Sequence, residues 1–283
     1  MQQALTGLHG GVGRLYGVLA EEPTSGSPAA DELRGFAHKQ LLGTARSAAS
    51  LLIETAGEQL TLFVKSVSPP AQPIACCGTV RSLLESCALA SWMIDPDIDR
   101  TERVGRVLAY GKEGLCQQLA YAQASAASQA SINLLKDRIR QLNTRGSQLR
   151  SSSAKGRNKG HRNGPVKMPD ATRAVAAILD EEVAYRILSA VVHGHSWAIQ
   201  EVGFDERAVP SGHLASSRIF PVRMQKAVKV EALAWLGLTA ARALCRPIWY
   251  VFNYEGWDTA ALQQVFEDSF DRLHAVESIR FWR

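Results

Sequence analysis

The sequence predicts an all-α protein, an up-and-down helical bundle that carries one long basic loop. Leucine, isoleucine and alanine recur at spacings of three and four residues along most of the chain, as on one face of an α-helix. Alternation of apolar and polar residues, the pattern of strands, is almost absent. Stretches rich in proline, glycine and serine separate the helical segments from one another.

The composition is that of a globular protein with a sizeable core. Of the 283 residues, 46% are hydrophobic and 21% are charged. No stretch approaches about 18 consecutive apolar residues, so we expect no membrane span. The first residues lack the pattern of a signal peptide. The five cysteines contain no CxxC pair. We therefore expect reduced, structural thiols, a cytoplasmic location, and neither a metal site nor a cofactor.

Two regions are predicted, a flexible arm over residues 1–30 and a single helical domain over residues 31–283. The arm is rich in glycine, serine, proline and alanine and shows no sustained period. Asp31 is the expected cap of the first helix, which ends before the proline-rich stretch SPPAQP. A short and strongly apolar helix follows in TVRSLLESCALASWMI.

The middle of the chain predicts a long helix and then a disordered basic loop. Asp95 and Pro96 provide an expected cap and first residue for a helix that continues to about residue 142. The loop covers about residues 147–167. Of the 32 Lys and Arg residues, ten lie between positions 136 and 167, beside one of the 27 acidic residues. The net charge of +5 therefore originates in this segment.

Three further helices complete the prediction. Pro169 and Asp170 open the first, which contains ILDEEVAYRILSAVVHGHSW. The second spans about residues 222–253 and is expected to bend or break near Pro247, because proline interrupts the backbone hydrogen bonds of a helix. The last begins with Asp258 as its cap.

A polar stripe marks the helix that contains ILDEEVAYRILSAVVHGHSW. On a helical wheel its members share one face, with Tyr185 beside them: Glu182, Arg186, Ser189 and His193. Apolar residues flank the stripe on both sides, and a solvated face would usually carry Lys, Glu and Gln. We therefore expect the stripe to lie inside the bundle, where its polar groups must find hydrogen-bond partners.

Polar residues of other helices are the expected partners. Arg81 and Glu85 are the charges of the apolar helix, and Arg103 and Arg106 open the long helix. One interpretation is a buried ion-pair network that fixes the register of the helices. The other is a polar pocket in which arginines hold an anion and His193 moves a proton. Helical spacing directs His193 and its neighbour His195 apart, which argues against a shared metal ion.

The phrase YRILSAVVH resembles a Tyr-Arg-x-x-Ser-x-x-x-His signature of helical bacterial proteins related to the HEPN superfamily (higher eukaryotes and prokaryotes nucleotide-binding). The phrase RSLLE is similar to those proteins too, and the resemblance covers about residues 35–275. It implies a helical bundle that often dimerises and a metal-independent ribonuclease of toxin–antitoxin or phage-defence systems. By this resemblance Arg186 would stabilise the charge of the transition state and His193 would transfer protons.

The basic loop has two open interpretations. It either attracts a nucleic-acid backbone without regard to sequence or serves as a solubilising linker. The residues expected to contact phosphates are Arg150, Lys155, Arg157, Lys159 and Arg162. The functional hypothesis is RNA or nucleotide binding, with ribonuclease activity in a stress or phage-defence setting and a homodimer as the assembly. The alternative is a non-catalytic helical interaction protein whose buried Arg/Glu/His cluster is structural.

Overall fold

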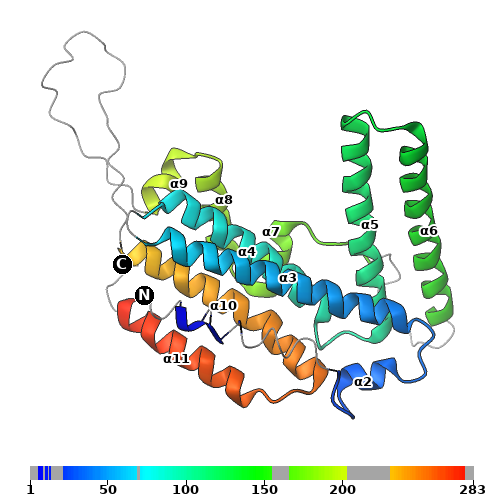
Figure 1. Cartoon of the computed structure of the whole chain (residues 1–283), viewed down its shortest axis with the longest axis horizontal. Coiled ribbons are helices and arrows are strands. Elements are labelled where there is room, and N and C mark those ends of the chain that lie inside the picture. The colour runs from blue at the N-terminus through cyan, green and yellow to red at the C-terminus, as the bar shows by residue number, and fades with distance from the viewer. Residues whose placement is uncertain are drawn as a thin grey trace, which may run out of the picture.

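All described elements of regular structure are helices, which confirms the predicted all-α class. Three long helices lie side by side at the centre of the bundle (Figure 1): α3 (Lys39–Ser66), α4 (Pro73–Ile94) and α10 (Val230–Glu255). Helix α11 (Ala260–Glu277) packs against α10. The structure is a computed structural model that describes residues 6–8, 10, 11, 13, 22–68, 71–154, 166–202 and 230–277.

Helix α4 forms the centre of the core because it is apolar around most of its circumference. Its side chains Leu83, Leu84 and Met93 are inaccessible to solvent, and α3, α10 and α8 all pack against it. A helix with apolar residues on every side is stable only when it is surrounded. Burial raises the pKa of Cys76 to about 11 and that of Cys77 to about 12, so these thiols pack as small neutral groups.

Helices α5 (Arg100–Ala124) and α6 (Gln129–Ala154) form an antiparallel hairpin that projects from the bundle (Figure 1). The prediction of one continuous helix to about residue 142 is therefore wrong. The chain reverses where Ala126 adopts a left-handed φ of 52° and the amide of Ala127 donates to the carbonyl of Ala122 over 2.9 Å. Glycine usually occupies the left-handed position of such a helix end. Alanine occupies it here, so the sequence offers no recognisable turn residue.

Both ends of the hairpin differ from the prediction. Asp99, and not Asp95, caps α5, because its side chain accepts hydrogen bonds from the amides of Thr101 and Glu102. Helix α6 continues to Ala154, so the predicted loop is helical over residues 147–154. Leu149 explains this extension, since it is buried in a small cluster with α3 and α5 side chains. The remainder of the predicted loop up to residue 165 lies outside the described residues.

Part of the predicted flexible arm belongs to the folded domain. Helix α2 (Pro28–Leu33) begins inside it, with the side chain of Ser27 as its cap. Ala29 is fully buried, and the amide of Thr24 donates to the carbonyl of Glu255 at the end of α10. Asp31 therefore lies in the first turn of α2 and does not cap a helix.

The segment predicted as one helix, opened by Pro169 and Asp170 and continuing through residue 197, is divided into four short elements. They are α7 (Ala171–Ala174), a π-helix (Val175–Leu179), α8 (Glu182–Val192) and α9 (Ser196–Glu201). Helix α7 runs directly into the π-helix. Left-handed residues separate the π-helix from α8, at Asp180 with φ 60°, and α8 from α9, at Gly194 with φ 75°. Each break redirects the chain, so side chains before and after it no longer share the face that a single helical wheel assigns them.

The C-terminal helices are close to the prediction. Helix α10 is continuous through Pro247, and residues 222–229 of the predicted helix lie outside the described part of the chain. Asp258 acts as the predicted cap of α11, since its Oδ1 accepts the amide of Ala260 over 2.9 Å.

A substitution at Gly256 tests how tightly the chain packs where α2, α10 and α11 meet. It has a φ of 73°, and a Cβ at this position would lie 2.7 Å from the Cβ of Ser27. We predict that Gly256→Ala lowers the free energy of unfolding by at least about 1–2 kcal/mol, because a side chain is strained there. The same change at Gly43, a helical position with open space around it, should raise stability by about 0.5–1 kcal/mol. Urea unfolding followed by circular dichroism measures both, and shifts of the same sign would contradict the assignment.

Candidate functional site

The polar stripe of α8 faces solvent, so the expectation that it lies inside the bundle is wrong. Arg186 pairs with Glu182 over 2.7 Å, and their side chains are 64% and 47% exposed. His193 is exposed at the C-terminal cap of α8, and Ser189 is half-buried. The apolar residues that flank the stripe in sequence misled the prediction. Val183, for example, is itself 69% exposed.

Tyr185 does not face solvent with the stripe. Its side chain contacts Arg81 and Glu85 where α4 and α8 pack together. Its hydroxyl donates to Glu85 Oε1 over 2.8 Å and accepts from Arg81 Nη2 over 3.4 Å. Arg81 also pairs with Glu85 over 3.1 Å. Burial is the main cause that raises the pKa of Tyr185, so the phenol stays neutral. The structure thus unites three of the predicted residues in a small hydrogen-bonded contact, whereas Arg186 and His193 face solvent.

Arg103 and Arg106 form a second, separate cluster at the C-terminal end of α4. The expectation that they face the same place as Arg81 is wrong. Arg106 donates to the carbonyl of Trp92, and Trp92 lies about 16 Å from Arg81 along the axis of α4. Arg103 is 1% exposed and donates to the carbonyls of Met93, Asp95 and Ile98.

The same guanidinium of Arg103 also joins distant elements. It pairs with Glu32 of α2 over 3.0 Å and lies 4.3 Å from the centre of the Tyr254 ring of α10. The Tyr254 hydroxyl donates to Glu32 over 2.7 Å. Arg106 completes the cluster by donating to the carbonyl of Trp92 and pairing with Glu102 over 2.7 Å. This is a structural arginine–glutamate network, and none of its hydrogen bonds involves histidine.

The exposed surface of α6 is basic, and its Lys and Arg side chains flank the contact with α5 on both sides. A narrow row of partly buried residues along α6, which includes Leu142 and Leu149, packs on α5. The positions of α6 between these residues are exposed. Helix α6 contains five basic residues and one acidic residue, Asp137, which pairs with Arg140. The exposed basic side chains of this surface are Lys136, Arg138, Arg140 and Arg145. The other predicted phosphate contacts, Lys155, Arg157, Lys159, Arg162 and the side chain of Arg150, lie outside the described part of the chain.

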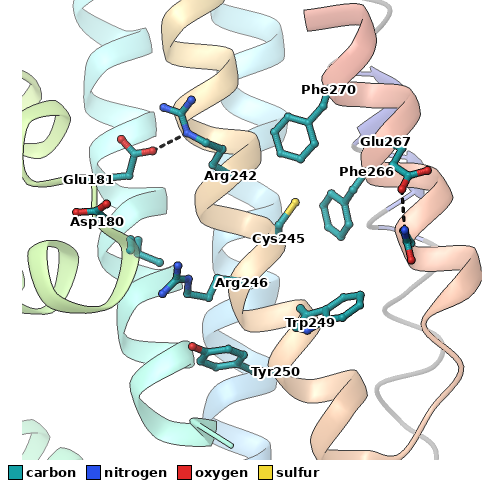
Figure 2. A pocket seen from close by; sticks show the side chains of 12 residues that line it. Asp180, Glu181, Arg242, Cys245, Arg246, Trp249, Tyr250, Phe266, Glu267 and Phe270 are labelled. Carbon is teal, nitrogen blue, oxygen red and sulfur yellow. Dashed lines mark hydrogen bonds and ion pairs between the residues drawn. The ribbon is translucent and has the colours of Figure 1, made fainter. Parts of the chain in front are cut away.

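A cleft of about 870 Å³ lies between α10, α11 and the turn at Asp180, and the sequence analysis missed it. Figure 2 shows Arg242 and Arg246 extending from α10 toward that turn, while Phe266 and Phe270 approach from α11. Arg242 Nε donates to Glu181 over 2.8 Å, and Arg246 donates to the carbonyl of Ile178. The sequence did contain a sign of this cleft. The spacing of Arg242, Arg246 and Trp249 places all three on one face of a helix whose other residues are typical of the core.

Comparison with known proteins finds no matching family model, no matching curated protein and no matching solved structure. Within the described ranges, no group of three or more His, Cys, Asp or Glu residues is arranged to hold a metal ion. None of the described helices combines the length and apolar character that crossing a membrane requires. Functional inference therefore depends on the basic surface of α6, the exposed face of α8 and the cleft along α10.

Among the polar residues of the described fold, Arg103 should contribute most to stability. We predict that Arg103→Met lowers the free energy of unfolding by about 3–5 kcal/mol, because the change removes the cationic partner of Glu32 and leaves three carbonyls without their donor. Thermal and urea unfolding measure the effect. The control is Arg34→Met, which removes an ion pair with Asp31 whose side chains are 72% and 57% exposed and should cost less than about 1 kcal/mol. Equal losses for the two variants would show that the network around Arg103 adds nothing.

Proposed function

We propose that the protein binds RNA through the exposed basic side chains of α6. The observation that carries this proposal is the exposure of Lys136, Arg138, Arg140 and Arg145 on a hairpin that projects from the bundle. A projecting helix can approach an extended strand without steric interference from the remaining helices. Lys and Arg side chains that neutralise phosphates release counterions, which favours binding independently of sequence.

The distribution of charge supports a phosphate backbone as the ligand of this surface. Asp137 is the only acidic residue of α6, so most of its basic side chains have no carboxylate within the same helix. Basic residues continue through positions 155–167 of the sequence. A solubilising surface would usually mix both signs of charge. Concentration of one sign along one hairpin favours a long polyanion as the partner.

RNA cleavage by α8 is a second candidate function, in line with the resemblance to HEPN-related proteins. It is supported by the accessibility of Arg186 and His193, which lie on one face of α8 at a separation of about 10 Å along the axis. In this reaction Arg186 would stabilise the negative charge on the phosphoryl oxygens and His193 would transfer a proton. Glu182 holds the guanidinium of Arg186, so the scissile phosphate would have to replace this carboxylate.

The salt dependence of RNA binding tests the basic surface. If four side chains contact phosphates of a single strand, log K should fall with log salt concentration with a slope of about −3. The triple variant Lys136→Gln, Arg138→Gln and Arg145→Gln should reduce the steepness of that slope by about 2. Fluorescence anisotropy with a labelled, unstructured RNA measures both quantities.

A variant with the same loss of charge elsewhere controls for net charge. Arg34, Lys65 and Arg173 are exposed on other elements of the bundle, and their replacement by Gln should leave the slope nearly unchanged. Equal weakening by the two triple variants would show that the protein's overall charge, and not α6, attracts RNA. A wild-type protein that does not bind RNA at low salt would refute the proposal.

Substitutions on α8 test cleavage separately from binding. His193→Ala and Arg186→Ala should each reduce the rate of RNA cleavage by about 10²- to 10⁴-fold. Because both side chains are exposed, the melting temperature should change by less than about 3 °C. Gel analysis of total RNA and calorimetry provide the measurements. Intact RNA after incubation with the wild-type protein would exclude cleavage but would leave RNA binding by α6 in place.

A further inference from the structure

An exposed stripe of large side chains runs along α10, a helix that otherwise belongs to the core. Leu244 and Ile248 of α10 are buried against the bundle, whereas Arg242, Arg246 and Trp249 point away from it. Trp249 is 41% exposed. Tryptophan and arginine are the residues most enriched at the energetic centres of binding surfaces. Their presence together on the open face of a core helix therefore indicates a ligand.

The walls of the cleft along this stripe differ in chemistry. On the side of α11 the wall is aromatic, with Phe266 almost buried and Phe270 half-buried, and Trp249 adds a further ring from α10. On the opposite side the two arginines extend toward Asp180 and Glu181 (Figure 2). The volume of about 870 Å³ falls in the range of sites for small molecules. A ligand with a flat ring at one end and an anion at the other would match both walls.

The arginines are held in place before any ligand arrives. Glu181 accepts from Nε of Arg242, and the carbonyl of Ile178 accepts from Nη1 of Arg246. Each guanidinium carries five N–H donors, so both retain donors beyond these contacts. Anchoring a long side chain in advance reduces the entropy lost on binding. Planar guanidinium groups are well suited to the oxygens of a phosphate.

The carboxylates of the cleft limit the charge of the ligand. Asp180, Glu181 and Glu267 line it together with the two arginines, so the acidic residues outnumber the basic ones by one. This surplus opposes each additional negative charge of a ligand, so a polyphosphate is disfavoured relative to a single phosphate. A single phosphate can be placed on the arginine side, while Glu267 on the aromatic side can accept hydrogen bonds from hydroxyl groups, as carboxylates do from ribose.

We propose that this cleft binds a single nucleoside monophosphate unit. The base stacks on Trp249 beside Phe266, the phosphate accepts hydrogen bonds from Arg242 and Arg246, and the ribose hydroxyls donate to Glu267. The unit is either a free mononucleotide or the phosphorylated end of an RNA strand, which share this chemistry. The inference does not depend on RNA binding by α6, because the cleft and the hairpin are formed by different helices.

Isothermal titration calorimetry of the full chain with AMP, GMP, CMP and UMP tests the proposal. At least one monophosphate should bind, and its nucleoside should bind about tenfold more weakly because it lacks the phosphate. The corresponding triphosphate should also bind more weakly, and inorganic phosphate alone should give no heat. A 5′-phosphorylated RNA that displaces the mononucleotide would identify the strand end as the ligand. A mononucleotide that resists displacement would identify the free form.

Two variants assign the binding to the cleft. Trp249→Ala should weaken binding by about tenfold or more through loss of stacking. Trp197→Ala, a matched change of a 53% exposed tryptophan on α9, should have no effect. Arg246→Gln should remove the preference for the monophosphate over the nucleoside. Both cleft residues are exposed, so calorimetric melting should confirm that the variants remain folded. The proposal fails if no monophosphate binds, or if Trp249→Ala binds as the wild type does.

Discussion

The buried guanidinium of Arg103 joins four elements of the bundle at one point. It extends from α5, closes the C-terminal end of α4 through three carbonyls, pairs with Glu32 of α2 and lies against Tyr254 of α10. A charge at 1% exposure is tolerated only when its donors are satisfied, so each partner is held in a narrow range of positions. The positive charge also offsets the partial negative charge at the end of α4.

This junction determines where the α5–α6 hairpin can lie. Helix α5 begins beside the end of α4, and both Arg103 and Arg106 fix its first turns against that end. Beyond Leu108 the exposed positions of α5 increase, and α6 contacts it along a single seam. The hairpin therefore projects from the bundle (Figure 1). The basic side chains of α6 are exposed to solvent as a result.

The candidate surfaces on α8 and α10 share a common origin in the way the core is filled. Helix α4 occupies the centre, so α8 and α10 each bury one side against it and leave part of the opposite side uncovered. On α8 the uncovered side carries Arg186 and His193, and on α10 it carries Arg242, Arg246 and Trp249. On α8 the buried and exposed sides are separated by a single residue. Tyr185 is buried and donates a hydrogen bond to Glu85, whereas the next residue, Arg186, is exposed.

The sequence alone determined the helical class, the apolar character of α4, the cap at Asp258 and the concentration of basic charge after residue 136, because these depend on local period and composition. It also named Arg81, Glu85 and Tyr185 as residues of one polar cluster, but it expected Arg186 and His193 to be the partners of Arg81 and Glu85. The tertiary structure decided where the chain turns, where helices end and which helix faces are buried, because periodicity does not contain this information. Ala126 reverses the chain in a position where glycine is usual, and Leu149 packs into a cluster with α3 and α5 that lengthens α6. Asp180 interrupts a segment that its periodicity predicts as one helix. The solvent exposure of Arg186 and the burial of Arg103 have the same cause. A helix pattern specifies which residues share a face, whereas the other helices determine which face is covered.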